Sequence, residues 1–256
     1  MISFFSRPLR LVALVVILGV AGAGWWIWQG AHSSTPVDST AAVSEFRSAA
    51  TADVAPRAGV PAAGVYRFRV TGEEAAGSGV LSAERPLPGE AVYIITPDEA
   101  GYHEDLRFSE EHAEEARFRV DAEGSTAVWR RTKVMFLGMG TDDRDDVKPA
   151  ALDHPATMKP GATWGGEYKL GDLVVTYTAK VTGTGTATID GKRVKTVTFR
   201  TEATYTGSTP GDRTDVVTWA PALSLPVAWS IDQTTGGDAA FTMTADMELV
   251  STTPER

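Results

Sequence analysis

Hydrophobic and polar side chains alternate along most of the chain after its first quarter. The alternation is clearest at 66–71, 175–181, 197–205 and 241–249. A period of two places one row of side chains in a core and the next row in water, which is typical of strands in an antiparallel sheet. The pattern therefore predicts a β domain over residues 64–256.

Turn residues fall between these runs. Asp190-Gly191 separates two apolar segments and is a strong signal for a two-residue hairpin loop. Further strands are expected at 91–96, 102–108, 116–120 and 126–137. Consecutive strands usually pair, and a large, strongly twisted sheet tends to curl. We therefore expect an all-β fold: a strongly curved antiparallel meander, either a half-barrel or a barrel, of about ten strands.

Three segments depart from the alternation. Residues 109–115 read SEEHAEE and fit either a short helix or, as we favour, a turn between two strands. Residues 138–160 predict a long irregular connection. Glu73 and Glu74 follow Gly72, and we interpret them as the tip of a hairpin.

The N-terminal segment predicts the location of the protein. Residues 11–28 contain no charged side chain and would span about 27 Å as a helix, close to the thickness of a bilayer core. Arg7 and Arg10 precede this segment, so residues 1–10 are expected in the cytoplasm and the rest outside. The alternative is a signal peptide cleaved after Ala23. The apolar run continues past that site, which favours an uncleaved, single-pass signal anchor in the cell membrane.

The segment after the anchor has the composition of a linker. Residues 29–63 are rich in Ser, Thr, Ala and Pro and show neither the strand nor the helix period of apolar residues. Such a composition favours a disordered tether between the membrane and the domain. The remaining residues, 64–256, fit one extracytoplasmic domain.

Composition excludes several classes of function. The chain has 24 basic and 33 acidic residues, which give a net charge of −9, and it has no cysteine. The absence of cysteine excludes disulfides, cysteine-based metal sites, a thiol nucleophile and a lipid anchor attached to cysteine. The acidic balance argues against nucleic acid as a partner, because phosphate binding needs a basic surface.

The sequence offers two weak candidates for a metal site. His103 and His112 lie nine residues apart in acidic sequence and would share a metal only if a hairpin brought them together. The acidic cluster at 142–146 (DDRDD) lacks the glycine and the distal glutamate of a calcium loop. We interpret both as solvated surface, and we predict no metal and no cofactor.

The signals for catalysis are weaker still. His154 precedes Pro155 and has no recognisable nucleophile partner in the sequence. The chain also lacks the Gly-x-Ser-x-Gly motif of many hydrolases. We therefore predict no catalytic residue.

Four tryptophans of the β domain are the candidate binding residues. Each lies in or beside an expected strand, where a large aromatic side chain is most often part of the core. On the concave face of a curved sheet the same side chains would bind an apolar or a sugar ligand. These candidates are Trp129, Trp164, Trp219 and Trp229.

Several short motifs resemble a known family. They are 63–68 (AGVYRF), 159–164 (KPGATW), and 219–221 (WAP) followed by 225–227 (LPV). In this order they resemble an uncharacterised family of actinobacterial membrane-anchored extracytoplasmic proteins. That resemblance implies one N-terminal helix, a linker and a β-rich domain. The half from Pro160 onward also resembles the half-barrel sheets of lipid-carrier proteins, and no activity is implied.

These observations predict a non-enzymatic, membrane-anchored protein outside the cytoplasm. Its expected role is binding, either of an apolar envelope ligand on a concave sheet face or of another envelope protein. Two alternatives stay open: a structural or assembly scaffold with no ligand cavity, and an unrecognised extracytoplasmic hydrolase. An empty apolar interior would favour a carrier, whereas a filled one would favour a scaffold.

Overall fold

The structure is a computed structural model that describes residues 33–49, 57–78, 81–136, 139–237 and 240–256. These residues form one helix, α2 (Ser39–Ala49), and one antiparallel sheet of thirteen strands. The strands are β1 (Gly64–Ser78), β2 (Leu81–Pro86), β3 (Glu90–Pro97), β4 (Gly101–Arg107), β5 (His112–Val120), β6 (Gly124–Phe136), β7 (Met139–Pro155), β8 (Thr163–Leu170), β9 (Leu173–Ile189), β10 (Lys192–Thr206), β11 (Gly211–Ala220), β12 (Leu225–Thr235) and β13 (Ala240–Leu249).

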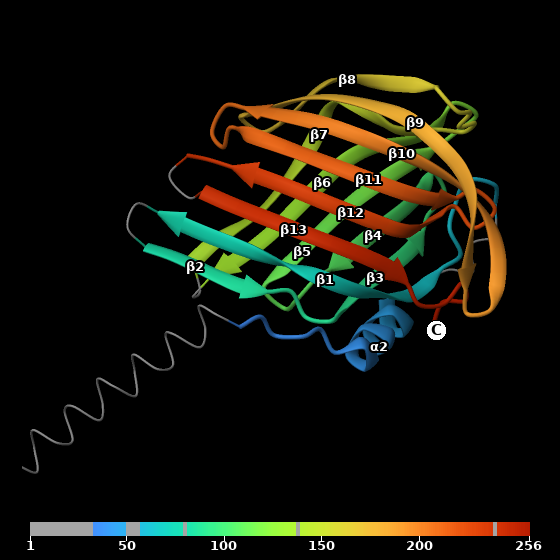
Figure 1. Ribbon diagram of the computed structural model, residues 1–256, viewed down its shortest axis with the longest axis horizontal. Coiled ribbons are helices and arrows are strands. Elements are labelled where there is room, and N and C mark those ends of the chain that lie inside the picture. The colour runs from blue at the N-terminus through green and yellow to red at the C-terminus, as the bar shows by residue number, and fades with distance from the viewer. Residues whose placement is uncertain (1–32, 50–56, 79–80, 137–138, 238–239) are drawn as a thin grey trace, which may run out of the picture.

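The sheet closes on itself. From β3 to β13 each strand pairs with the next in sequence, and β1 pairs with both β3 and β13 (Figure 1). Strands β1 and β3–β13 thus form a closed ring of twelve strands. Strand β2 is additional and lies beside the second half of β1. The predicted all-β antiparallel meander is confirmed, with thirteen strands instead of about ten, and its curvature is complete, so that the sheet is a barrel.

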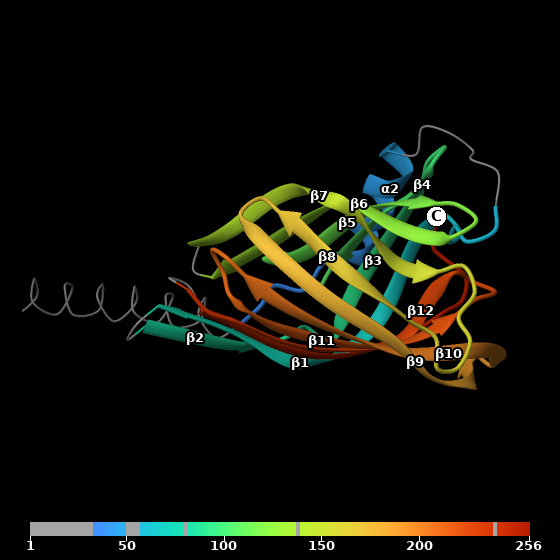
Figure 2. The same ribbon diagram turned by 90° about the horizontal axis from the view of Figure 1, so that it is seen from above.

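The ring is flattened into two layers. In Figure 1 strands β9–β13 and β1 lie in front of β3–β7, and Figure 2 shows the two layers from above. The turns lie at two ends. We call the end with the β1–β2, β4–β5, β6–β7, β8–β9, β10–β11 and β12–β13 turns the β6–β7 end. The other end, with the β3–β4, β5–β6, β7–β8, β9–β10 and β11–β12 connections, is the β3–β4 end.

The predicted alternation of buried and exposed residues is found in the strands. In β13, Met243 and Met247 are buried while Thr244 and Glu248 are exposed. The predicted Asp190-Gly191 hairpin joins β9 to β10, with φ angles of 47° and 72°. Positive φ at both residues is what a type I′ turn requires.

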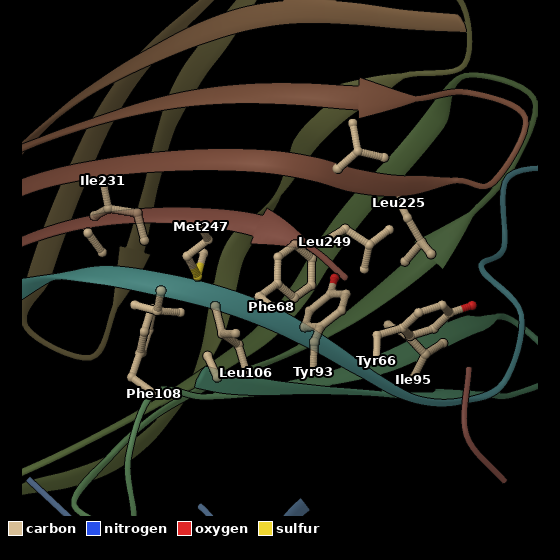
Figure 3. Close-up of a cluster of buried hydrophobic side chains, with 14 of the residues drawn as sticks. Tyr66, Phe68, Tyr93, Ile95, Leu106, Phe108, Leu225, Ile231, Met247 and Leu249 are labelled. Carbon is tan, nitrogen blue, oxygen red and sulfur yellow. The ribbon is translucent and has the colours of Figure 1, made fainter. Parts of the chain in front are cut away.

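An apolar cluster fills part of the interior (Figure 3). It joins side chains of both layers, such as Phe68 of β1, Leu106 of β4 and Met247 of β13. Phe68 meets Tyr93 edge to face, with ring centres 5.9 Å apart. Its members keep 0–7% of their surface exposed, so this part of the interior is filled.

The predicted tether differs from the structure in its middle. Residues 39–49 form α2, which lies on the outer face of the sheet (Figure 1). Its apolar residues are buried against Val65, Val92 and Ile94. The Asp38 side chain accepts a hydrogen bond from the backbone N–H of Thr40 and so caps the helix. The apolar stripe of this helix has only three residues: Ala42, Val43 and Phe46. So short a stripe does not stand out in a segment with the composition of a linker, and the helix was not predicted.

Two further expectations were wrong. Residues 139–155 form β7 instead of an irregular connection, because their acidic residues pair across the ladder with basic residues of β6, as Asp142 does with Arg131. Glu73 and Glu74 lie inside β1 and not at a hairpin tip. Gly72 lets β1 continue through this position close to β13. Its φ is 139°, and a Cβ there would lie 2.0 Å from the Thr244 carbonyl oxygen.

Other expectations are refined. Residues 109–111 form the favoured turn, and β5 starts at His112. The expected anchor at residues 11–28 lies outside the described residues. Within those that are described, no helix has the length and apolar character needed to cross a bilayer.

Candidate functional site

The inner face of the sheet carries ionisable side chains as well as the apolar cluster. Along β5 the inward-facing row passes from Phe118 and Ala116, which belong to that cluster, to Glu114. Glu114 lies near groups on facing strands, because it binds Arg213 of β11. We call six side chains on this face the inner charged network: Glu104, Glu114, Arg130, Asp153, Arg213 and Asp215.

Arg213 is the centre of one half of the network. Its Nη1 and Nη2 atoms donate to the two carboxylate oxygens of Glu114, at 2.7 and 3.2 Å. Its Nε donates to Asp215 at 3.0 Å, and Nη1 also donates to Gln233 at 3.1 Å. The indole Nε1 of Trp229 donates to Asp215 at 2.9 Å. Bidentate contacts of this kind fix the orientation of a guanidinium group.

Arg130 is the centre of the other half. Its Nη2 lies 3.2 Å from Asp153 Oδ1, and the second carboxylate oxygen of Asp153 lies 3.0 Å from Nδ1 of His154. The Arg130 guanidinium also lies 5.8 Å from the ring centre of Phe118. Its Nε is buried without a hydrogen-bond partner. This half of the network therefore keeps an unused donor on the inner face.

Glu104 differs from the other acids of the network. Burial raises its pKa to about 8, and the negative charge of nearby Asp153 adds to the rise, although the hydrogen bond from Tyr93 opposes it. The Tyr93 hydroxyl donates that bond to a carboxylate oxygen of Glu104. At neutral pH Glu104 is therefore mainly a protonated carboxyl, which can donate a hydrogen bond as well as accept one.

Glu114 and Asp153 stay ionised. Burial by itself would raise the pKa of Glu114, but the charge and hydrogen bonds of Arg213 lower it below the ordinary value. Burial likewise opposes ionisation of Asp153, and the hydrogen bond with His154 and the nearby charges of His154 and Arg130 lower its pKa. Water still reaches these groups, because the paired side chains are 13–34% exposed.

A second charged group, the buried Glu74 cluster, is closed to water. Glu74 accepts a hydrogen bond from Arg85 Nε at 2.7 Å and lies 2.6 Å from His112 Nδ1. All three side chains are 0–1% exposed. The guanidinium of Arg85 lies 3.9 Å from the ring centre of Phe136, and Phe241 meets the imidazole of His112 edge to face. This cluster joins β1, β2 and β5 and offers no access to a ligand.

Three of the four candidate tryptophans lie together on the inner face. Trp164, Trp219 and Trp229 pack in or against one cluster with Phe199. Trp164 lies edge to face with Phe199 at 5.3 Å, and the Trp219 ring lies 4.4 Å from the His154 ring. Because Trp229 binds Asp215, this aromatic cluster adjoins the inner charged network.

Trp129 lies apart from the other three. The register of β5 and β6 shifts between Ala127 and Trp129, and it places Trp129 opposite Arg117. Its indole lies between His103, at 5.1 Å, and the guanidinium of Arg144, at 4.0 Å. The extra residue in β6 turns this side chain to the outer face, so Trp129 is not part of the inner aromatic cluster.

The candidate metal ligands do not converge. His103 lies on the outer face, 3.2 Å from Glu115, whereas His112 lies on the inner face beside Glu74. Among the residues that the structure describes, no three His, Asp or Glu side chains are arranged to hold a metal ion.

The ladder of the barrel is weakest between β7 and β8. These strands pair at one position, Lys148 with Lys169, whereas β1 and β13 pair over ten residues each. A surface hollow lies over this seam, and charged side chains line it: Arg144, Asp145, Asp146, Lys148 and Lys169, together with Gly171.

Sequence reasoning missed the inner charged network, although a signal for it exists. In strands that contribute to the network, an acidic or basic residue interrupts the apolar row of the alternation. Examples are Glu104 between Tyr102 and Leu106, and Asp215 two residues before Val217. A charge at a position that the period of two assigns to the core marks either a buried ion pair or a site.

Comparisons with known proteins add little. No family model matches the chain, and no curated protein matches it. Among solved structures, the hypothetical lipoprotein YmcC from Escherichia coli (K12) superposes with a TM-score of 0.36 and 11% sequence identity. The match covers 74% of this chain and 85% of that one. A likeness at this level carries no argument, so the function rests on the site itself.

Proposed function

We propose that this protein is a non-enzymatic binding protein that holds a small amphipathic ligand inside its closed sheet. We further propose that residues 11–28 anchor it in the cell membrane and that the sheet lies outside the cytoplasm. One observation carries the binding role: the ion-paired side chains of the inner network are organised by hydrogen bonds and yet remain 13–34% exposed.

The energetic cost of burying ion pairs supports a functional role for the network. Placing ion pairs inside a protein costs desolvation energy, and apolar residues of similar size often give equal or greater stability. The facing apolar cluster shows that this sheet is able to fill its interior with such residues. Charged groups retained beside an aromatic cluster are typical of ligand sites, where a few polar groups orient the ligand.

The charges indicate the chemistry of the polar part of the ligand. Glu114, Asp153 and Asp215 offer acceptors, Arg130 offers a buried donor without a partner, and Glu104 is mainly neutral. The carboxylates outnumber the guanidinium groups, which disfavours an anionic head group. Hydroxyl groups both donate and accept, so a neutral, hydroxyl-rich head group satisfies both kinds of partner without adding charge.

The apolar part of the ligand would lie against aromatic side chains beside the network. Tyr168, Tyr205 and Trp229 face inward and are partly exposed, so they present surface that a ligand would cover. This proposal narrows the expected apolar ligand to an amphiphile, because the wholly apolar part of the interior is filled.

The contacts of the histidines support a role without catalysis. Each of His103, His112 and His154 lies beside a carboxylate. The hydrogen bonds that the rings of these three histidines make go to Glu115, Glu74 and Asp153, and not to a Ser or Thr hydroxyl. A hydrolase that used a serine activated by histidine would need that contact.

A pair of probe amphiphiles tests the proposal. The full chain, held in amphipol, is titrated below the micelle concentration with octyl glucoside and with octyl sulfate, and binding is followed by saturation-transfer NMR. We expect saturable binding of the glucoside and weaker binding of the sulfate. Arg213→Gln should weaken glucoside binding about tenfold, as the loss of one charged hydrogen-bonding group does.

Arg200→Gln is the matched control, because Arg200 is 47% exposed and pairs with Glu202 of its own strand. Its affinity should equal that of the unaltered chain. Equal losses in both variants would remove the network as the site, and an absence of saturable binding would favour the scaffold. Hydrolysis of the glucoside would instead favour the enzyme.

A further inference from the structure

The chain is attached to the sheet almost as soon as its description begins. The Ser34 hydroxyl donates to the carbonyl of Pro86 at 2.7 Å. The backbone N–H of Thr35 donates to Glu111 at 3.0 Å, and the Thr35 carbonyl accepts from the N–H of Glu110 at 3.0 Å. Helix α2 follows and packs on β1 and β3. The polypeptide is therefore fixed to the sheet from residue 34, not from residue 64.

This attachment lies at the β6–β7 end. Glu110 and Glu111 form the β4–β5 turn, and the carbonyl of Glu111 accepts a hydrogen bond from the N–H of Met135 at 2.9 Å. Met135 precedes the β6–β7 turn, where it pairs with Gly140. Figure 1 shows the same arrangement, with the start of the described chain below β2 and α2 farther along the sheet.

The length of chain between the apolar segment and this attachment is short. Six residues lie between Trp28 and Thr35, and the seven steps from Trp28 to Thr35 reach at most about 25 Å when the chain is fully extended. Strand β10 has 15 residues and is about 50 Å long. With the usual tilt of strands in a closed sheet, about 40°, the two ends are about 40 Å apart along the barrel axis. The β6–β7 end is thus held near the bilayer, while the β3–β4 end is out of reach of its surface in that orientation.

Acidic side chains lie in turns at both ends of the barrel. Glu110, Glu111 and Asp172 lie at the β6–β7 end, and Glu111 is engaged by Thr35. The turns of the β3–β4 end carry five acids: Asp98, Glu99, Asp121, Glu123 and Asp190. Two of these five pair with arginines, Asp98 with Arg117 and Asp121 with Arg119. The orientation therefore follows from the short chain between the apolar segment and the sheet and not from charge.

We propose that the β6–β7 end is docked on the head groups of the bilayer that anchors the chain, with the β3–β4 end directed away from it. The proposal rests on the anchor assigned to residues 11–28 under the proposed function. It adds an orientation to that function. The end of the barrel to which the apolar segment leads faces the lipid, and the membrane is the source of an amphipathic ligand.

The absence of native cysteine makes the orientation measurable in the full chain. Thr209→Cys places a unique thiol in the β10–β11 turn, and Glu123→Cys places one in the β5–β6 turn. Both positions are exposed. Each variant is labelled with bimane and reconstituted in vesicles of phosphatidylethanolamine and phosphatidylglycerol that contain a lipid with a nitroxide head group. Nitroxide quenching acts at short range compared with the roughly 40 Å between the ends.

We expect at least roughly threefold stronger quenching at Thr209→Cys than at Glu123→Cys, given that separation. A Gly/Ser insertion of about twenty residues between Gly30 and Ala31 should reduce the difference, because it restores a long flexible tether. Equal quenching at the two positions, or stronger quenching at Glu123→Cys, would overturn the orientation. Co-flotation with vesicles in which neither label is quenched would overturn docking while leaving the anchor intact. Failure to float with the vesicles would remove the anchor and the docking together.

Discussion

The inner face of the sheet has two regions, the apolar cluster and the inner charged network. They share the same strand geometry but differ in how much of their side-chain surface is exposed. In the apolar cluster Phe68 and Met243 are each 1% exposed. In the inner charged network, Arg130 and Asp153 keep about a third of their surface exposed. Both regions are built by the alternation of side chains along antiparallel strands. The difference shows that the alternation creates an inner face, and that residue type then decides whether this face becomes a packed core or an accessible polar surface.

The charged side chains themselves divide in the same way. The buried Glu74 cluster is 0–1% exposed and is covered by aromatic rings, whereas the network pairs are 13–34% exposed. A sealed ion pair contributes to the fold because removing one partner leaves the other charge buried. An accessible pair is partly screened by water and contributes less to stability. Stability measurements should therefore separate structural from functional charges.

The largest effect is expected in the sealed cluster. Glu74→Gln removes the carboxylate and leaves the Arg85 guanidinium buried with a neutral partner, so we expect a loss of about 3–5 kcal/mol in the free energy of unfolding. Glu73→Gln is the control, because Glu73 is exposed on the same strand, and it should cost less than about 0.5 kcal/mol. Urea melts of the full chain measure both. Similar small losses in the two variants would mean that the cluster does not hold β1, β2 and β5 together.

The aromatic part of the inner face should respond almost as strongly. Phe199 is 5% exposed and contacts Trp164, so Phe199→Ala should cost about 3 kcal/mol through lost burial and the cavity that remains. Thr198 is partly exposed and lies near Thr218, with their hydroxyls 3.3 Å apart. Thr198→Ala should cost well under about 1 kcal/mol. Melts that rank the two variants in the reverse order would show that the register of β10 is wrong.

The fold was predictable where local pattern and tertiary packing agree. The alternation at 241–249 and the Asp190-Gly191 turn predict β13 and the β9–β10 hairpin, and both are found. Strand β7 was not predicted because its acidic residues pair with residues of a neighbouring strand. The composition of a single segment does not reveal such pairing. Helix α2 was hidden because its short apolar stripe is stabilised by β1 and β3 and not by its own sequence.

The site was harder to predict than the fold, for a physical reason. The choice of Trp164, Trp219 and Trp229 identifies one wall of the inner face correctly, since aromatic residues mark inward positions. Trp129 fails because a one-residue bulge reverses the facing of a side chain, and periodicity does not locate bulges. The partners of Arg213 lie 99 residues away, at Glu114, and two residues away, at Asp215, so only the closed sheet brings them together.

A smaller effect is expected from the titration of Glu104. Its pKa is raised to about 8 in the folded state, against about 4.3 in an unfolded chain. Between these values the folded state holds a proton that the unfolded state has released. The contribution of Glu104 to stability is therefore lost as the pH rises from about 4.3 to 8.

Glu104→Gln removes this penalty. The variant should gain about 1–2 kcal/mol relative to the unaltered chain when the pH is raised from 5 to 8.5, less than the full shift implies because water reaches the site. Asp142→Asn is the control, because the hydrogen bond from Arg131 lowers the pKa of Asp142 and keeps it ionised over this range. Its difference from the unaltered chain should stay constant. A Glu104→Gln difference that is also constant would show that Glu104 is ionised throughout.

The smallest effect is expected in the accessible pair of Glu114 and Arg213, and it decides the comparison. Their atoms approach to 2.7 Å, yet the side chains are 19% and 13% exposed. A double-mutant cycle of Glu114→Gln and Arg213→Gln should therefore give a coupling energy of about 1 kcal/mol, between the values for exposed and for sealed pairs. In the same variants, the loss of free energy of glucoside binding should be larger than this coupling energy. A coupling energy of about 3 kcal/mol or more, with glucoside affinity unchanged, would show that this pair stabilises the fold as the Glu74 cluster does. A coupling near 1 kcal/mol with reduced affinity would instead show that the sheet keeps these charges for a ligand and not for its own stability.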